Sequence, residues 1–442
     1  MAERFLKIHN CQCSELKNIP QLPFDEFREL VVKKIQNGAR VIGFFGQANI
    51  DGTVTLFMVF ADDKKGYLTT FSTVVKNSYP SLTVQIPQVH LFEREIFEQC
   101  GVYPEGHPWL KPVRFHDSLQ VDPDNSGNKE IVSFVTDFFK IEGEEIHEVA
   151  VGPVHAGIIE PGHFRFQCHG EEVFHLEISL GYQHRGIEKV LIGGPDKRTI
   201  HYMETLAGDT TIGHSLAYCQ AMEGLANCHV SLKAAVLRAI MLELERLANH
   251  TGDLGALAGD IGFLPTSSYC GRLRGDFLNI TALVCGNRFG RNMIRPGGVA
   301  FDLTKSEIVE VKERIEKTFS DVKNAVSLLW DSSLVVDRFE ETGVVTKQTV
   351  LDLGLVGVVA RASGIERDVR FDFPTGAFRF SHIPVSTYSS GDVFARAFVR
   401  WLEIQRSVEF ILDQLNNLPD GEIAVSVPSI KPQHMIVSLV EG

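Results

Sequence analysis

The sequence predicts an α+β protein in which a small N-terminal α/β sandwich precedes a mainly α-helical domain that a small β element opens. Short runs of β-branched and aromatic residues, separated by turn signals, dominate residues 22–115. Long amphipathic stretches dominate after Asp196. A chain of 442 residues is also long enough for roughly two to three folding units, each with its own hydrophobic core.

The N-terminal elements are predicted in chain order from local patterns. The apolar stripe of Phe24–Gln36 predicts a helix. Residues 40–45 and 53–60 are strand-like runs joined through an Asn-Ile-Asp-Gly turn, so they predict a β-hairpin. Residues 68–79 are predicted to form another helix and residues 83–86 another strand.

A connector rich in carboxylates and turn-forming residues follows these elements. We therefore place an acidic linker at residues 121–147, between a first domain of residues 1–120 and a second domain of residues 148–442. Residues 148–166 and 172–177 are strand-like and open the second domain.

The rest of the second domain is predicted to be mainly helical. Its expected helices are residues 200–225, 228–253, 272–286, 305–330 and 393–415. Residues 435–440 predict a final strand, for which no partner strand is expected. We therefore expect the second domain to be incomplete at its C-terminal end.

Composition excludes several classes of protein. The chain has 56 Asp and Glu against 43 Lys and Arg, a net charge of −13 that disfavours binding to nucleic acids. The 8 cysteines follow no regular framework, which favours a reducing cytoplasm. No signal peptide is expected, and no apolar stretch approaches the roughly 20 residues of a membrane-spanning helix. Membrane contact is therefore expected only through partners.

Familiar cofactor motifs are absent from the sequence. It contains no Gly-x-Gly-x-x-Gly after a strand, no phosphate-binding loop, no His-Glu-x-x-His and no Cys-x-x-Cys. Cys11 and Cys13, beside His9, do not complete a tetrahedral metal site and are interpreted as ordinary thiols. No metal ligand is predicted in this chain.

Two loops carry the first candidate residues for chemistry. His155 and His163 lie among glycines and prolines, where a backbone can approach a ligand closely. His184, Arg185 and Glu188 cluster around a glycine, as a proton relay or cofactor site requires. A lone structural histidine or a plain surface loop would have a similar composition, and these interpretations stay open.

Two helical segments carry further polar side chains. His214 and Tyr218 lie four residues apart on one predicted helix face. In residues 243–250, Glu245 is expected to lie over Asn249, and Arg246 over His250. We interpret residues 243–250 as a source of hydrogen bonds between helices rather than as an active site.

Several motifs, in the same order along the chain, resemble those of a known family. They are Gly152-Pro-Val-His-Ala-Gly-Ile-Ile-Glu-Pro-Gly-His-Phe164, His184-Arg-Gly-Ile-Glu-Lys189, Glu245-Arg-Leu-Ala-Asn-His250, Arg295-Pro-Gly-Gly298 and Arg361-Ala-Ser-Gly364. Residues 148–442 thereby resemble the large subunit of group 4, energy-converting nickel–iron hydrogenases of the hydrogenase-4 and formate hydrogenlyase type. More loosely, they resemble the quinone-site subunit of NADH-quinone oxidoreductase, respiratory complex I. Residues 92–98 and 106–116 resemble the small peripheral-arm subunit of complex I, which would here be fused to the large one.

The chain departs from the hydrogenase pattern at the nickel ligands. The alignment places Ala207 and Thr210 where the first two cysteines belong, and Thr205 where an arginine is usual. The second cysteine pair would follow Gly442. The resemblance therefore implies that the thiolate ligands are lost, and that residues 209–211 replace them with hard oxygen groups.

The resemblance also implies roles for the candidate residues. Glu188 resembles the proton-transfer glutamate of the family, with a pKa that Arg185 would lower. His184, Asp209 and His214 are the other expected proton-handling residues. His155 or His163 would occupy the histidine region of a quinone pocket, to which Thr210 would contribute, whereas the tyrosine expected there falls at about Gly208.

The function implied by the resemblance is that of a peripheral-arm subunit, not a self-contained enzyme. It would couple electron transfer, with a quinone as the expected acceptor, to proton movement at the cytoplasmic face of the cell membrane. The chain itself would hold no cofactor, because the iron–sulfur cluster would belong to a small partner subunit. Antiporter-like membrane subunits are the other expected partners. The alternatives are a true nickel–iron hydrogenase large subunit and a non-catalytic assembly subunit.

Overall fold

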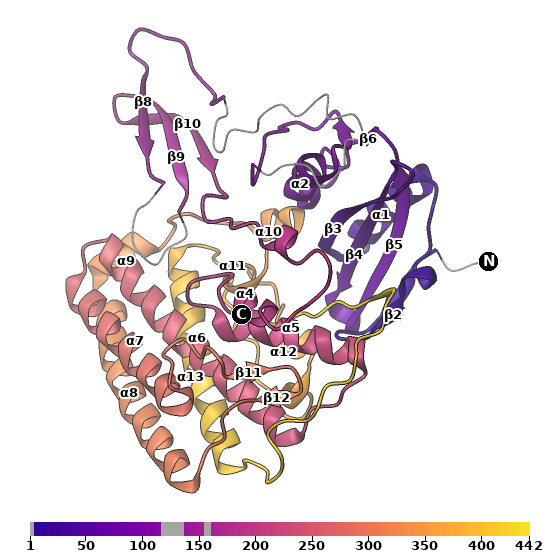
Figure 1. Cartoon of the computed structure of the whole chain (residues 1–442). Coiled ribbons are helices and arrows are strands. Elements are labelled where there is room, and N and C mark those ends of the chain that lie inside the picture. The colour runs from indigo at the N-terminus through magenta and orange to yellow at the C-terminus, as the bar shows by residue number, and fades with distance from the viewer. Residues whose placement is uncertain (1–3, 116–136, 154–160) are drawn as a thin grey trace. The chain divides into compact units, whose positions relative to one another are not determined.

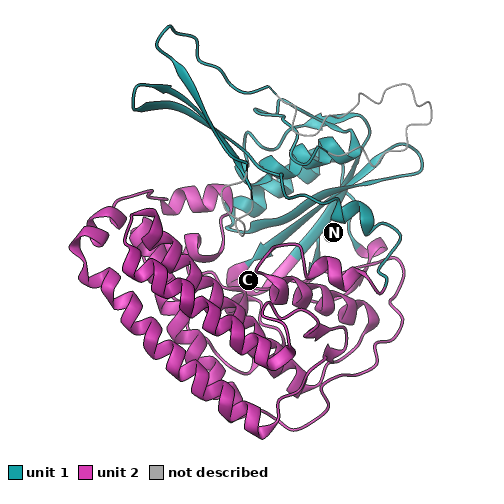
Figure 2. Cartoon of the chain, turned by 60° about the vertical axis from the view of Figure 1, so that its left-hand side comes forward, with its two compact units in different colours: residues 1–7, 19–62, 69–196 teal, residues 8–18, 63–68, 197–442 magenta. Residues whose placement is uncertain are grey.

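A computed structural model describes residues 4–115, 137–153 and 161–442 of the chain. Its contacts divide the chain into two compact units (Figure 2). Unit 1 comprises residues 1–7, 19–62 and 69–196, and unit 2 comprises residues 8–18, 63–68 and 197–442. The predicted α+β class is confirmed, with β-rich elements first and helices after them (Figure 1). The predicted domain boundary within residues 121–147 stays a prediction, because residues 116–136 lie outside the described ranges.

An antiparallel sheet and its helices form the N-terminal part of the fold. The sheet has the order β1-β5-β4-β3, with β1 at Leu6–Ile8, β3 at Arg40–Ala48, β4 at Val54–Asp62 and β5 at Tyr67–Val75. Helix α1 spans Phe24–Gln36, as predicted. Its Phe27 packs on Phe44 of β3 and Phe71 of β5, and this aromatic contact anchors the helix on the sheet. The predicted β-hairpin is confirmed as β3 and β4.

Two local predictions in this region are wrong. Residues 68–79 form β5 and the short strand β6, Ser78–Pro80, rather than a helix, because the buried Thr69, Thr70 and Thr73 favour a strand. Residues 83–86 form a turn rather than a strand.

The buried carboxylate of Glu93 explains this turn. Glu93 lies on α2, His90–Cys100, and accepts hydrogen bonds from the main-chain N–H groups of Leu82 and Thr83 at 2.9 and 3.2 Å. It also accepts from the Ser81 and Thr83 hydroxyls, both at 2.6 Å. These amides are therefore not available to a neighbouring strand. After helix α2 comes strand β7, Tyr103–Glu105, which pairs parallel with β6.

Three further strands form a separate antiparallel sheet in the order β10-β9-β8 (Figure 1). They are β8 at His147–Val151, β9 at His163–His169 and β10 at Glu172–Ser179. The strand predicted at residues 148–166 is thus two strands, whereas the one predicted at residues 172–177 is confirmed. The single-turn helix α3, Ile187–Val190, follows this sheet.

Unit 2 is built around the long helix α6. Its helices are α4 Thr199–Met203, α5 Thr211–Ala226, α6 Leu232–Asp260, α7 Leu264–Cys285, α8 Lys305–Asp331, α9 Ser333–Phe339, α10 Lys347–Leu353, α11 Gly357–Ala362, α12 Val369–Asp372 and α13 Val393–Asn416. Buried residues occur all round α6, which contacts α5, α7 and α13. A helix that is buried on every side belongs in the centre of a bundle.

The helix predicted at residues 200–225 is broken in the structure. It ends as α4 and resumes as α5, because residues 208–211 (Gly-Asp-Thr-Thr) are weak helix formers. The Thr211 hydroxyl donates to the main-chain carbonyl of Glu204 at 3.0 Å and closes the intervening turn. This break places Asp209 and Thr210 outside both helices. The other predicted helices are present, with α7 starting earlier than expected, at Leu264.

The final strand-like run has a partner, contrary to the prediction. Strand β13, His434–Met435, pairs antiparallel with β2, Ser14–Glu15. Main-chain hydrogen bonds from Cys11 to Val437, and from Leu16 to Gln433, extend this pairing. Local patterns could not reveal it, because more than 400 residues separate the two segments. Within the described ranges, none of the helices has the length and apolar character needed to cross a bilayer.

Candidate functional site

The first candidate cluster surrounds α3 in unit 1. Gly186 adopts the left-handed conformation that starts this helix and presents Glu188 in its first turn. Glu188 Oε1 lies 3.0 Å from Arg114 Nη1, and Glu188 Oε2 lies 3.8 Å from His184 Nε2. The Glu188 side chain is 45% exposed and that of His184 is 15% exposed. The predicted pair of Glu188 and His184 is therefore in contact at the protein surface.

Arg114 joins two carboxylates in this cluster. Besides Glu188, it forms an ion pair with Glu95 of α2. Burial raises the pKa of the Glu95 carboxyl, an effect that the Arg114 guanidinium partly offsets and the charge of Glu188 reinforces. Arg185, the cation that the sequence predicts beside Glu188, is exposed in the loop before α3. Arg114 lies in the motif at residues 106–116, but the spacing along the chain did not indicate its contact with Glu188.

Only one of the two histidines predicted for the quinone pocket lies within the described residues. His155 lies outside the described residues. His163 begins β9, and its ring lies 5.5 Å from that of Phe138 between centroids. Its Nε2 atom is buried and has no hydrogen-bond partner among the described residues. A ligand oxygen is the kind of partner that such an atom requires.

The second candidate cluster is the turn before α5 in unit 2. Asp209 Oδ2 lies 3.5 Å from Arg274 Nη2 of α7, and the Asp209 carbonyl accepts from the Asn249 side chain at 3.2 Å. Thr210 is the residue immediately before α5. His214 lies one turn into the helix and is half-buried. Asp209, Thr210 and His214 belong to unit 2, whereas the α3 cluster belongs to unit 1.

Glu245 holds the start of α5 and was not predicted as a site residue. Its two carboxyl oxygens accept from the main-chain N–H groups of Ile212 at 2.7 Å and Gly213 at 3.0 Å. Burial raises the pKa of this carboxyl to about 8, despite these two hydrogen bonds. The group can therefore carry a proton at neutral pH beside Asp209. The spacing of Glu245 and Asn249 along α6 gives no sign of this contact with the start of α5.

Two of the motifs meet in a buried network of ion pairs in unit 2. Arg361 is 1% exposed and donates to Glu403 at 2.6 Å and to Glu441 at 2.7 Å. His250 contacts the other oxygen of Glu403 at 2.7 Å. Because Glu403 lies on α13 and His250 on α6, this bond joins two helices, as expected for the 243–250 segment.

Further charged residues extend this network. Its remaining side chains are Glu243, Arg246, Asp368 and Arg370. Although burial acts to raise it, the pKa of Glu403 is held well below its usual value by Arg361 and the His250 hydrogen bond. Arg246 also donates to the main-chain carbonyl oxygens of Glu441 and Gly442 at 2.9 and 3.0 Å. The network therefore fixes helices α6, α11 and α13 against residues 441–442.

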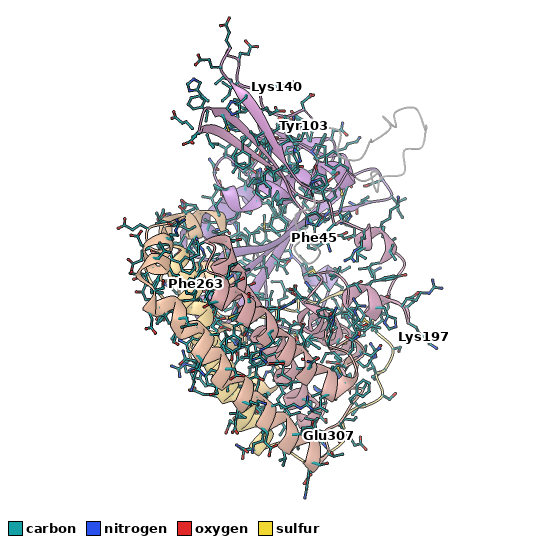
Figure 3. All side chains as sticks on the ribbon, turned by 90° about the vertical axis from the view of Figure 1, so that its left-hand side faces the viewer. Phe45, Tyr103, Lys140, Lys197, Phe263 and Glu307 are labelled. Atoms are coloured by element: carbon teal, nitrogen blue, oxygen red, sulfur yellow. The ribbon has the colours of Figure 1, made fainter. Side chains whose placement is uncertain are left out.

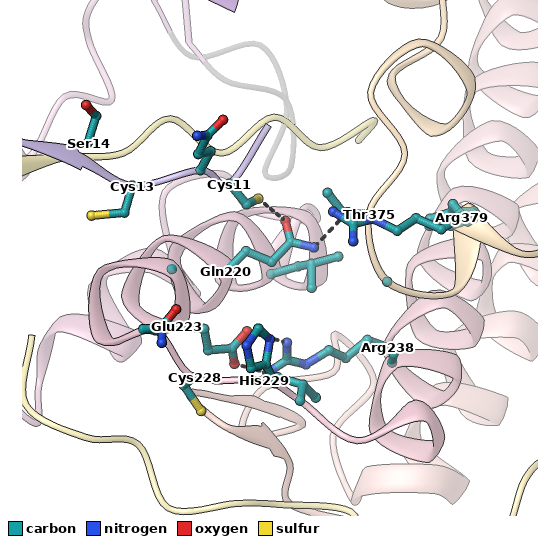
Figure 4. Close-up of a pocket in the computed structure, with 18 of the residues that line it drawn as sticks. Cys11, Cys13, Ser14, Gln220, Glu223, Cys228, His229, Arg238, Thr375 and Arg379 are labelled. Carbon is teal, nitrogen blue, oxygen red and sulfur yellow. Dashed lines mark hydrogen bonds and ion pairs between the residues drawn. The ribbon is translucent and has the colours of Figure 1, made fainter. Parts of the chain in front are cut away.

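A pocket of about 680 Å³ opens in unit 2 (Figure 4). Three thiols lie in its wall, those of Cys11, Cys13 and Cys228, and the Cys11 thiol contacts Gln220 at 3.6 Å. Burial raises the pKa of all three cysteines, which keeps them protonated. A buried pair of Glu223 and Arg238, 2.6 Å apart, closes one side.

The described structure contains no cluster of potential metal ligands, either in this pocket or elsewhere. Within residues 4–115, 137–153 and 161–442, no three His, Cys, Asp or Glu side chains gather as a metal site would require. None of the predicted site residues that the structure describes lines the pocket.

Comparisons with known proteins match both parts of the chain. Residues 260–440 match the family of the 49 kDa subunit of respiratory-chain NADH dehydrogenase, and residues 13–124 match the family of its 30 kDa subunit. The chain is 32% identical to NADH-quinone oxidoreductase subunit 4 of Thermus thermophilus, over 67% of this chain and 73% of the relative. It is 27% identical to formate hydrogenlyase subunit 5 of Escherichia coli, over 90% of this chain and 72% of that relative. It is also 27% identical to hydrogenase-4 component G of Escherichia coli, over 82% of this chain and 65% of that relative.

Proposed function

The chain belongs to the family of the 49 kDa subunit of respiratory-chain NADH dehydrogenase, with a 30 kDa-like domain fused before it, and from this we propose its function. We propose that it is a peripheral-arm subunit of a membrane-bound, complex I-like oxidoreductase. In that complex it would couple electron transfer to a quinone with proton movement. The cluster of Glu188, His184 and Arg114 is the observation that supports this role best.

Quinone reduction consumes protons as well as electrons, so the site needs groups that can deliver protons. Glu188 has the required position in its cluster, because one oxygen faces a guanidinium and the other faces an imidazole 3.8 Å away. Its partial exposure allows it to exchange protons with water or with a partner group. We propose that Glu188 and His184 transfer protons in unit 1, where the Arg185 guanidinium on the same loop adds a fixed positive charge. We propose the same proton-transfer role for Asp209 and His214 in unit 2.

We propose that the quinone head group is bound by His155, His163 and Thr210. The buried Nε2 atom of His163 has no hydrogen-bond partner in the part of the chain that the structure describes, and this supports the assignment because a quinone carbonyl would satisfy it. The Thr210 hydroxyl, before the first turn of α5, is a second group able to hydrogen-bond a polar head group. Electrons would come from an iron–sulfur cluster on a small partner subunit, and antiporter-like subunits would hold the complex at the cytoplasmic face of the membrane.

The donor set does not fit a nickel–iron centre, and we propose that none is held here. At the aligned positions, the Ala207 methyl group offers no ligand and the Thr210 hydroxyl is a hard oxygen donor. Nickel–iron chemistry requires soft thiolates instead. The proposal therefore assigns no step to a metal on this chain.

Replacement of Glu188 by Gln in the assembled complex tests the function. Gln keeps the size of the side chain but cannot carry a transferable proton, so quinone reductase activity is expected to fall by about 100-fold. Lys189→Gln, on the adjacent exposed position of α3, is the matched control and should retain activity. The pH dependence of the remaining activity should also change in Glu188→Gln, which a purely structural role would not produce.

Two results would contradict the proposal. Unchanged electron transfer and proton movement in Glu188→Gln would favour a non-catalytic assembly subunit. Stoichiometric nickel in the same purified complex would favour a hydrogenase large subunit.

A further inference from the structure

The sheet of β8, β9 and β10 has two faces of opposite character. Paired residues of antiparallel strands point to the same side of a sheet, so the strand register defines each face. One face, called the apolar face below, carries two rows of side chains. These rows are Val149, Phe166 and Leu176, followed by Val151, Phe164 and Ile178.

The opposite, polar face is covered by the chain itself. Glu177 accepts from the Phe139 main-chain N–H at 2.8 Å, and Gln167 donates to Glu148 at 2.8 Å. The Arg165 guanidinium lies 4.1 Å from the centre of the Phe138 ring. Gln167 and Glu177 are consequently only 3% and 6% exposed. The segment around Phe138 therefore covers the side of the sheet that carries its charges.

The side chains that the two outer strands contribute to the apolar face are exposed in the described structure, and those of the central strand are half-buried. Val149 and Val151 are each 40% exposed, Leu176 is 43% exposed and Ile178 is 41% exposed. An antiparallel sheet with one wet face ordinarily turns its polar side to water, which is the reverse of what this sheet does. A contiguous exposed patch of this kind marks a binding surface rather than a scatter of single apolar residues.

Carboxylates border one end of the apolar face. The pairing of His147 with Cys168, and of Cys168 with Val173, brings the segment before β8 and the β9–β10 turn to the same end of the sheet. The exposed acidic residues at this end are Glu142, Glu144, Glu145, Glu171 and Glu172. Lys140 precedes them (Figure 3), and His169 pairs with Glu145 at 2.6 Å. The border therefore carries a net negative charge.

We propose that the apolar face binds another protein subunit, through an apolar surface bordered by lysine or arginine residues. That this partner is a subunit of the same complex rests on the proposed function. Cations at its edge would pair with the carboxylates and orient the contact. Anionic lipid head groups would be repelled by the same carboxylates, and a second copy of a chain with net charge −13 would be repelled as a whole.

Site-specific photo-crosslinking in the assembled complex identifies the occupant. A photoreactive phenylalanine analogue replaces Leu176 in the tagged full-length chain, and the same analogue at Ile50 is the control. Ile50 also belongs to unit 1, but it is fully exposed and lies in the β3–β4 turn. The expected product from position 176 is a crosslink to one defined subunit of the complex, at an apolar peptide that contains Lys or Arg. Position 50 should not crosslink to that peptide.

Matched variants test the contribution of the face to assembly. Leu176→Glu with Ile178→Glu should lower the amount of that subunit recovered with the tagged chain at least tenfold. Ile50→Glu with Val84→Glu adds the same charge at exposed positions and should recover a normal amount. The melting temperature of each isolated variant should match the wild type, which separates lost binding from lost folding. Glu171→Lys with Glu172→Lys should weaken recovery at low salt more than at high salt.

Three results would overturn the proposal. Normal recovery of every subunit with the Leu176→Glu, Ile178→Glu variant would exclude the face as a binding surface. A crosslink from position 176 to a second copy of this chain would assign it to self-association. Binding of the wild type, but not of this variant, to phosphatidylglycerol vesicles would assign it to the membrane. Recovery is measured without a redox assay, so failure of the role proposed for Glu188 would leave this test unaffected.

Discussion

At the scale of single residues, Glu245 shows how position changes the chemistry of a carboxyl group. Its two oxygens accept from the first main-chain N–H groups of α5, where a charged carboxylate would be favoured by the helix dipole. Burial nevertheless raises its pKa to about 8, because the loss of water outweighs the hydrogen bonds, and nearby Asp209 adds to the rise. Glu245 is thus a proton-holding group next to the proposed quinone-binding turn.

The raised pKa of Glu245 predicts how stability depends on pH. The folded state holds the Glu245 proton up to about pH 8, whereas the unfolded state releases it near pH 4.5. The stability that this proton contributes is therefore fully present below pH 4.5 and is lost as the pH rises to about 8. Relative to Glu245→Gln, the wild type should lose a few kcal/mol of unfolding free energy across this range. Urea denaturation at several pH values measures the difference. Parallel pH profiles for the two proteins would contradict the assignment.

Elements are held together here by charges as well as by apolar packing. Arg361 on α11 contacts Glu403 on α13, which contacts His250 on α6, so one chain of polar contacts crosses three helices. A buried arginine of this kind stabilises little by itself, because desolvation offsets most of its attraction to carboxylates. Its removal is costly because it leaves buried carboxylates without a cation.

Arg361→Met should therefore destabilise the protein strongly. The substitution keeps much of the side-chain volume but removes the guanidinium that neutralises the buried carboxylates of Glu403 and Glu441, which is expected to cost about 3–5 kcal/mol. Arg406→Met is the matched control, because Arg406 pairs with Glu409 at the surface and should matter by less than about 1 kcal/mol. Chemical denaturation of both variants gives the comparison. A loss for Arg361→Met no larger than that of the control would show that the network carries no stability.

At the scale of the whole molecule, residues 8–18 belong to the helical unit rather than to the N-terminal one. Asn10 is buried there and bonds two distant segments. Its side chain donates to the carbonyls of Phe373 at 2.9 Å and Leu439 at 3.0 Å, and accepts from the Leu439 N–H at 2.8 Å. The start of the chain thus supplies a strand partner and an anchor for residues 433–439.

Loss of the Asn10 side chain should loosen this anchor. Asn10→Ala leaves buried main-chain groups unsatisfied, so it is expected to cost about 1–3 kcal/mol. The amides of Cys11 and Leu439 should exchange with solvent faster, as hydrogen-exchange mass spectrometry can measure. Gln12→Ala, at an exposed position two residues on, is the control and should leave this exchange unchanged. Equal protection of residues 433–439 in both variants would contradict the anchoring role.

Local sequence patterns and the order of the motifs were enough to predict several elements of the fold and the family of this protein. Helix Phe24–Gln36 and the β3–β4 hairpin followed from periodicity and a turn signal, since both depend on neighbours in sequence. The order of the motifs indicated the family, because the family's chemistry depends on particular residue types at particular positions. Glu188 and His184, which the sequence places in one cluster, lie in contact and are only four residues apart along the chain.

Only the tertiary structure decided which distant groups meet. It made residues 67–75 a strand by pairing them with β4 and β1, and it gave β13 a partner from residues 14–15. It brought the distant Arg114 into contact with Glu188, and it placed the Glu245 side chain of α6 at the start of α5. The physical reason is that burial and long-range hydrogen bonds arise from packing, and packing partners leave no periodic signal in the segments they join.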